Sequence, residues 1–173
     1  MFKILVSLLI LIISLTSCNK PKEKQLNVSV KLEITGKGYY QYGKNIKYRD
    51  DYFSRVSITN HEDSTITLWM MSCSWWHETL IFDTNSIEFS AGGCDKNIPV
   101  KVELKPGKSL IVYPVFHVDS KNIKQVRMGF VMLKEEELNK HFKDWAKFIK
   151  SKSIYWSNPA LLRSRNNDYR IEK

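Results

Sequence analysis

Apolar and polar residues alternate with a period of two in many short stretches of this chain, and this pattern limits the folds that the chain can adopt. In the first stretch every second residue is apolar: Leu26, Val28, Val30, Leu32 and Ile34. Such a stretch predicts a β-strand that buries one face. Strand character recurs at residues 52–60, 65–71, 79–83, 86–90, 99–104, 109–118, 126–133 and 154–162. The sequence therefore predicts about nine strands.

Turn sequences between these stretches indicate how the strands connect. Residues 60–64 are polar, and they predict a hairpin between strands 52–60 and 65–71. The segment Lys105-Pro106-Gly107-Lys108 has proline and glycine at the two central positions that a type II turn requires. Strand 109–118 is apolar on both faces, so we expect it at the centre of its sheet with strand 126–133 beside it.

One segment has the periodicity of a helix. Within residues 135–150 the apolar residues form a single stripe, at Leu138, Phe142, Trp145, Ala146 and Ile149. Glutamates lie at the start of this segment and lysines lie toward its end, which matches the helix dipole at both termini. We expect one amphipathic helix here, before the last strand.

These elements predict an all-β domain over residues 26–162, built as a β-sandwich of about nine strands with the helix inserted before the last strand. Strands and helices do not alternate, as a parallel sheet would require. Residues 163–173 are polar and basic, and we expect them to form a C-terminal tail.

The N-terminal residues 1–17 predict a signal peptide. Lys3 precedes an apolar run that is too short to span a bilayer, and small residues follow the run. The sequence Leu15-Thr16-Ser17-Cys18 resembles the lipobox of bacterial lipoproteins. This resemblance implies that the signal is removed, that Cys18 is lipidated and that residues 18–25 tether the domain to a membrane. An ordinary secretory signal with a nearby cysteine is the alternative.

The residue after the lipobox cysteine bears on the destination of the protein. An aspartate there resembles an inner-membrane retention signal of Gram-negative lipoproteins, whereas this chain has Asn19. The resemblance therefore implies a cell-envelope protein that is anchored in the outer membrane.

A second resemblance concerns the domain itself. The strand-turn-strand sequences at residues 56–60, 66–68 and 104–110 resemble those of bacterial immunoglobulin-like domains, and they are similar to uncharacterised small lipoproteins of Gram-negative bacteria. This implies an immunoglobulin-like sandwich, although the predicted helix departs from the plain pattern. The resemblance implies a fold, and it carries no function.

Two cysteines remain once Cys18 carries lipid. In an oxidising compartment, Cys73 and Cys94 predict a disulfide. A free or metal-binding pair is the alternative.

Two groups of aromatic residues are candidates for binding a partner. Tyrosines alternate with lysines between residues 35 and 51, and tryptophans flank Cys73. Exposed aromatic rings can stack on a sugar or anchor a protein. The alternative is that the tyrosines cover a sandwich edge and that the helix covers the tryptophans. The candidate binding residues are Tyr39, Tyr40, Tyr42, Trp75 and Trp76, and Trp69 belongs to the same tryptophan group.

Charge and motif content narrow the function further. The chain has 27 Lys plus Arg against 18 Asp plus Glu, a net charge of +9. Outside the cytoplasm, a basic face meets lipid phosphates, acidic glycans or acidic proteins more readily than nucleic acid, or its lysines simply solvate the surface. None of the motifs HExxH, GxSxG, GxxxxGK[ST] and paired CxxC occurs, so we expect neither an enzyme nor a cofactor.

The sequence predicts a non-enzymatic, lipid-anchored module that contacts a protein or glycan in the envelope. The alternative is a periplasmic copper(I)-handling protein that uses Met71, Cys73 and His77, with His117 as a further ligand. Because Met70 and Met71 point to opposite faces of a strand, at most one of them can join Cys73 in such a site. Protease inhibition is a third hypothesis, by analogy with other small immunoglobulin-like domains.

Overall fold

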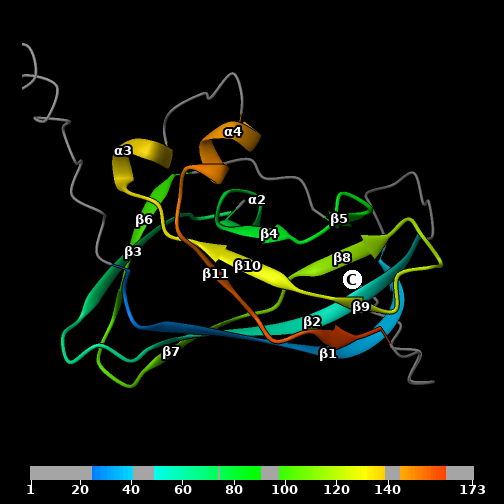
Figure 1. The fold of residues 1–173 in the computed structure, drawn as a ribbon, viewed down its shortest axis with the longest axis horizontal. Coiled ribbons are helices and arrows are strands. Elements are labelled where there is room, and N and C mark those ends of the chain that lie inside the picture. The colour runs from blue at the N-terminus through cyan, green and yellow to red at the C-terminus, as the bar shows by residue number, and fades with distance from the viewer. Residues whose placement is uncertain (1–24, 41–48, 74, 91–97, 139–144, 163–173) are drawn as a thin grey trace, which may run out of the picture.

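The computed structural model describes residues 25–40, 49–73, 75–90, 98–138 and 145–162 (Figure 1). The strands in these ranges are β1 (Val28–Tyr40), β2 (Arg49–Asn60), β3 (Ile66–Met71), β4 (Leu80–Phe82), β5 (Ile87–Phe89), β6 (Pro99–Leu104), β7 (Ser109–Val112), β8 (Val115–Val118), β9 (Gln125–Val126), β10 (Met128–Val131), β11 (Ile154–Trp156) and β12 (Ala160–Leu161). The helices are α2 (Trp75–Thr79), α3 (Glu135–Leu138) and α4 (Trp145–Lys150). All paired strands are antiparallel, so the expected all-β class is confirmed.

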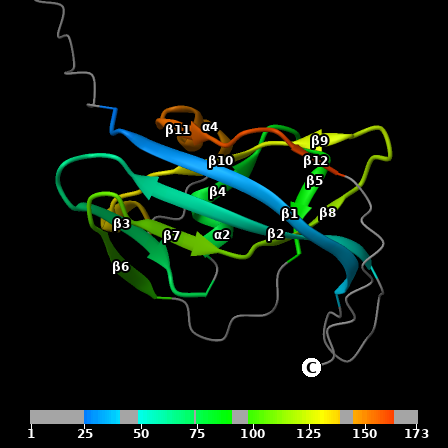
Figure 2. The ribbon, with the colours of Figure 1, turned by 90° about the horizontal axis from the view of Figure 1, so that it is seen from below.

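The largest sheet is organised around two long strands, β1 and β2 (Figure 2). They pair from Val28 opposite Asn60 to Tyr40 opposite Arg49, with a bulge between Ile34 and Gly36. One part of β2 also pairs with β7 and another with β8, and β8 pairs with β5. Residues 35–40 and 49–51, which the sequence left without a strand pattern, therefore extend the two arms of a long hairpin. Residues 41–48 between these arms lie outside the described ranges.

The predicted hairpin between strands 52–60 and 65–71 is wrong, because β3 pairs with β6 instead of β2. The fully buried Asn60 explains the separation. Its Nδ2 donates hydrogen bonds to the carbonyl oxygens of Ser64 and Leu104, both at 2.8 Å, and its Oδ1 accepts one from the Glu62 amide at 2.8 Å. These bonds tie the end of β2 to the end of β6, so the chain passes from one sheet to the next.

The predicted continuous strand 109–118 is also wrong, since it divides into β7 and β8 at Tyr113 and Pro114. Proline has no amide hydrogen to contribute to a ladder. The carbonyl of Pro114 instead accepts hydrogen bonds from the amide and the hydroxyl of Ser54, at 3.2 and 2.7 Å. The expected neighbour is wrong too, because β10 pairs with β4 and β11 and not with this segment.

Other local predictions have mixed outcomes. The type II turn is confirmed: Gly107 has φ of +68°, and the Lys108 amide donates to the Lys105 carbonyl at 3.1 Å. Both ends of the predicted helix 135–150 are helical, as α3 and α4, while residues 139–144 lie outside the described ranges. The predicted last strand divides around Pro159 into β11 and β12.

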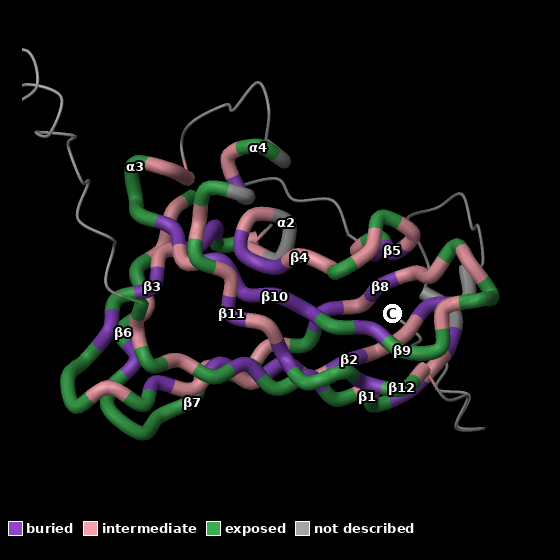
Figure 3. Tube along the Cα trace, in the orientation of Figure 1, coloured by how far each residue is buried: buried purple, intermediate pink, exposed green. Residues whose placement is uncertain are grey.

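Strand β10 is buried along its whole length (Figure 3), and its residues contribute to two apolar clusters. The larger cluster lies between β10 and the long strands β1 and β2, and it contains the fully buried Val56, Phe116 and Phe130. The smaller one packs Val131 and Leu133 against Ile149 of α4. This layered core fits a β-sandwich with helices on its outer side. Within the described ranges, no helix has the length and apolarity needed to cross a membrane.

Candidate functional site: a groove beside Trp69

Of the five aromatic residues predicted to bind a partner, the structure describes the side chain of one, Trp75. Trp75 starts α2, where it is half-buried and packs against the larger core cluster. Tyr39 and Tyr40 belong to β1 and Trp76 to α2, but their side chains lie outside the description, as does the whole of Tyr42. The structure therefore places one member of the set, Trp75, at the margin of the core.

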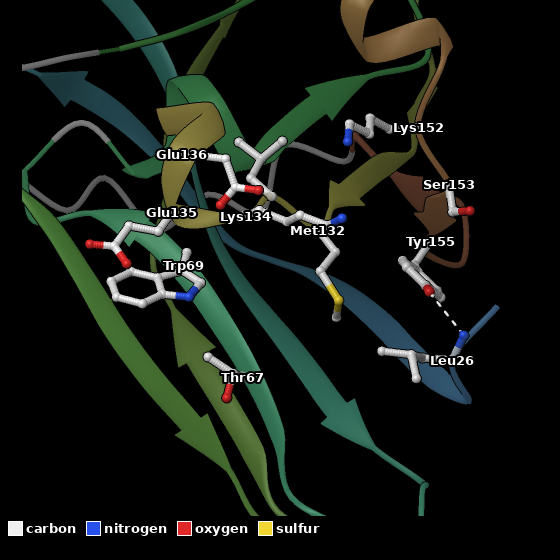
Figure 4. Close-up of a pocket in the computed structure, with 11 residues that line it drawn as sticks. Leu26, Thr67, Trp69, Met132, Lys134, Glu135, Glu136, Lys152, Ser153 and Tyr155 are labelled. Atoms are coloured by element: carbon white, nitrogen blue, oxygen red, sulfur yellow. Dashed lines mark hydrogen bonds between the residues drawn. The ribbon is translucent and has the colours of Figure 1, made fainter. Parts of the chain in front are cut away.

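A groove of about 380 Å³ lies beside Trp69, a third tryptophan of the same sequence region (Figure 4). Trp69 and Glu135 lie at one side of it, Tyr155 and Leu26 lie at the other, and Met132 lies between them. We call this feature the Trp69 groove. Its lining consists of Leu26, Thr67, Trp69, Met132, Leu133, Lys134, Glu135, Glu136, Lys152, Ser153 and Tyr155.

Strand β3 builds the first wall through its alternation. Its residues Ile66, Leu68 and Met70 are buried in the core, so Thr67 and Trp69 point to the opposite face. An isolated antiparallel bridge joins Trp69 to Leu133, which holds the segment between β10 and α3 against this wall. Leu133 is itself buried in the smaller core cluster. The backbone that carries the Trp69 indole is thus held by pairing on both sides, with β6 and with Leu133.

Strand β11 builds the second wall. Tyr155 is 8% exposed, and its ring packs against Phe130 with the ring centroids 6.5 Å apart. Its hydroxyl oxygen accepts a hydrogen bond from the Leu26 amide at 3.2 Å (Figure 4). This bond fixes Leu26, just before β1, to a strand that lies more than a hundred residues later in the chain.

An ion pair holds Lys152, one of the lining residues, in place. Lys152 Nζ contacts Glu137 Oε1, and the two side chains are 14% and 13% exposed. The Lys134 amide donates to Glu137 Oε2 at 2.9 Å, which is one half of a capping box at the start of α3. Burial raises the pKa of the Glu137 carboxyl, but the hydrogen bonds and charges of Lys152 and Lys134 lower that pKa by more. Glu137 is therefore ionised at neutral pH and joins α3 to the segment after α4.

The residues expected for a disulfide or a copper site are placed only in part. Met71 is buried at the end of β3, and Cys73 follows it half-buried. Cys94 and the side chain of His77 lie outside the described residues, so both the disulfide and the copper site stay predictions. Across the described part of the chain, no cluster of three or more His, Cys, Asp or Glu side chains is arranged to hold a metal ion.

His117, the further copper ligand that the sequence suggested, lies on a different sheet from Met71. It lies on β8, where Nδ1 is 3.3 Å from Asp51 Oδ1 and Nε2 is 3.4 Å from Asp119 Oδ1. Asp51 is completely buried on β2. His117 thus contacts Asp51 of β2 and Asp119, the residue after β8, whereas Met71 and Cys73 belong to the β3 segment.

Sequence reasoning missed most of the groove because its residues come from four separate parts of the chain. Leu26 precedes β1, Thr67 and Trp69 lie on β3, Met132 to Glu136 follow β10, and Lys152 to Tyr155 precede or begin β11. None of these segments carries a local motif. The one available signal was Trp69, which alternates outward on a strand whose other face is apolar.

No family model matches the chain, and comparisons with curated proteins and with solved structures found no similar protein. The function is therefore inferred from the chemistry of the Trp69 groove.

Proposed function

We propose that the protein is a lipid-anchored module of the cell envelope that binds a protein or glycan partner in the Trp69 groove, without catalysing a reaction. One observation carries this proposal: the groove combines a half-buried indole and a thioether with exposed hydroxyl and charged groups. Apolar contact area gives affinity, and polar groups around it orient the bound molecule.

The construction of the groove supports binding. Its volume of about 380 Å³ falls within the range of typical ligand sites, ~300–1,000 Å³. Three connections hold its walls: the Trp69 to Leu133 bridge, the Leu26 to Tyr155 hydrogen bond and the Glu137 to Lys152 ion pair. Walls that are fixed before binding reduce the entropy that a partner must offset.

The proposed anchor places the groove close to the membrane. If Cys18 is lipidated, residues 19–25 connect it to Leu26, which lines the groove. Seven extended residues span at most roughly 25 Å. The partner is therefore a component that comes within this distance of the membrane surface, and we propose the outer membrane on the basis of Asn19.

Two further features complete the proposal. The layered core supports an immunoglobulin-like sandwich, and the turn at residues 104–110 is the part of the turn-sequence argument that remains, because residues 56–60 and 66–68 do not form a hairpin. A disulfide between Cys73 and Cys94 would connect the end of β3, and so the wall that carries Trp69, to the segment before β6.

Site-specific photo-crosslinking in intact cells tests the groove. A photoreactive residue replaces Thr67 on one wall or Ser153 on the other, and the control replaces Lys31, which is exposed on the outer face of β1. We expect a shared adduct from Thr67 and Ser153 and none from Lys31. Equal adducts from all three positions, or none from the groove, would contradict the proposal.

Intact-mass measurement of protein extracted from membranes tests the anchor and the disulfide. We expect the mass of a lipidated chain that begins at Cys18, and a gain of two hydrogens on reduction. The matched variant Cys18→Ala should retain its signal and carry no lipid. An unmodified Cys18 would refute the anchor, and a retained copper ion with no change on reduction would favour the copper-handling alternative.

A further inference from the structure

The charges around the Trp69 groove are balanced. Lys134 and Lys152 contribute two positive groups to the lining, and Glu135 and Glu136 contribute two negative ones. Lys152 is also bound to Glu137 at the rim. Although the chain as a whole has a net charge of +9, the groove has no excess of positive charge with which to hold a polyanion. This balance favours an uncharged occupant over lipid phosphates or acidic glycans.

The arrangement of apolar and polar groups matches a particular ligand class. A sugar ring has a flat face of C–H groups and a rim of hydroxyls, so it needs an aromatic surface with hydrogen-bonding groups around it. Trp69 supplies an indole, and Glu135 lines the groove on the same side as Trp69 (Figure 4). Thr67 and Ser153 supply exposed hydroxyls from β3 and from the residue before β11.

A polypeptide occupant is less well matched. A peptide anchor residue is typically enclosed in a fully desolvated apolar pocket. Here the lining includes the apolar residues Trp69, Met132 and Leu26 together with exposed carboxylates and hydroxyls. Carboxylates accept hydrogen bonds from several sugar hydroxyls at once, whereas a peptide backbone offers only one donor for each residue.

We propose that the Trp69 groove binds an uncharged saccharide, with one sugar ring stacked on the Trp69 indole and its hydroxyls donating hydrogen bonds to the Glu135 and Glu136 carboxylates. This inference rests on the proposed function, since it names the partner class of the same site. A groove of about 380 Å³ holds a short oligosaccharide segment and leaves the rest of a glycan chain outside.

The test uses the full lipidated protein in a detergent without a sugar headgroup, because a glycoside detergent would compete for the groove. Calorimetric titration measures binding of a panel of uncharged oligosaccharides that includes the N-acetylglucosamine trimer, with a sulfated oligosaccharide for comparison. We expect at least one uncharged oligosaccharide to bind and the sulfated one to bind more weakly.

Variants connect that binding to the groove. Trp69→Phe keeps an aromatic ring and should retain binding within a few-fold, whereas Trp69→Leu should weaken it roughly tenfold. Thr67→Arg places a long side chain in the groove from an exposed position, so it tests the site even if Trp69→Leu fails to fold. Lys31→Ala on the outer face of β1 should bind like the unmodified protein.

The outcomes distinguish a failure of the saccharide inference from a failure of the proposed function. Binding of the sulfated sugar alone, or binding that Thr67→Arg leaves unchanged, overturns the saccharide inference. If the Thr67 photo-adduct is digested by protease and no uncharged sugar binds, the partner is a protein: the saccharide inference fails and the proposed function stands. If neither groove position gives a specific adduct and no sugar binds, both fail.

Discussion

Replacing Gly129 by alanine tests the packing around the smaller core cluster, against which Ile81 and Ile154 pack. Gly129 lies in the middle of β10, opposite Ile81 of β4 and Trp156 of β11. A Cβ at this position would lie 2.6 Å from Ile154 Cγ2 and 3.1 Å from both Ile81 Cγ1 and Trp156 Cε3. Ile154 is β-branched and therefore stiff at χ1, so it cannot rotate away freely. The strands must separate to admit a single methyl group.

The expected cost follows from this overlap. Inserting a methyl group into a packed core destabilises a protein by roughly 1–3 kcal/mol, and the 2.6 Å contact places Gly129→Ala toward the upper end. For a domain of this size that corresponds to a fall in Tm of roughly 5–10 °C. Urea unfolding and thermal melting of the variant measure both values. Since β11 carries Tyr155, the displacement should also disturb the Trp69 groove.

Gly107 provides a matched control with a different physical cause. Its φ is +68°, but a Cβ there would have no atom within 4 Å. Gly107→Ala should therefore cost about 1 kcal/mol through backbone strain alone. Ile154→Ala removes the methyl group that the new Cβ of Gly129→Ala would meet, so the double variant should lose less stability than the sum of the two single variants. Additive losses, or a stable Gly129→Ala protein, would refute the packing argument.

Two further predictions concern polar contacts, and both are measured by urea unfolding. Asn60→Ala should cost roughly 3 kcal/mol, because it leaves the buried Leu104 carbonyl without its donor, while exposed Asn85→Ala should have almost no effect. Glu137→Gln should cost about 1 kcal/mol at pH 7 by removing the charge paired with Lys152. Because the pKa of Glu137 is lowered in the folded state, this contribution is present above the pKa of an unfolded glutamate and is lost as pH falls through the folded-state value. The stability difference should disappear in acid, and a difference that persists there would contradict the assignment.

The sequence predicted where strands occur better than how they pair. Alternation at residues 26–34 is a local property, and β1 begins within this stretch at Val28 but continues beyond it to Tyr40. Pairing depends on distant contacts, such as the hydrogen bonds from Asn60 to both Ser64 and Leu104. Pro114 is a local signal for a break within residues 109–118, because proline cannot donate to a strand ladder. The apolar residues on both sides of it nevertheless favoured one continuous strand. The type II turn was predictable because proline fixes φ at the first central position and glycine readily adopts the positive φ that the second one requires.

The candidate site was less predictable than the fold. Sequence patterns drew attention to clustered aromatics, yet Trp75 packs against the core while Trp69 borders a groove. The difference arises because Trp69 lies on the outward face of β3 and Trp75 lies at the start of the short helix α2. Tyr155 and Met132 join Trp69 only through the pairing of β10 with β11 and the bridge to Leu133.

Oxidative footprinting in living cells tests most directly whether the Trp69 groove is occupied. Hydroxyl radicals oxidise indole and thioether groups in proportion to their accessibility, so Trp69 and Met132 report on the groove itself. Tyr113 is 67% exposed and does not line the groove, so it serves as the internal control. We predict that Trp69 and Met132 are oxidised less in intact cells than in the purified protein, while Tyr113 is oxidised equally in both. Equal oxidation of all three residues in the two samples would contradict a groove that is occupied in the envelope.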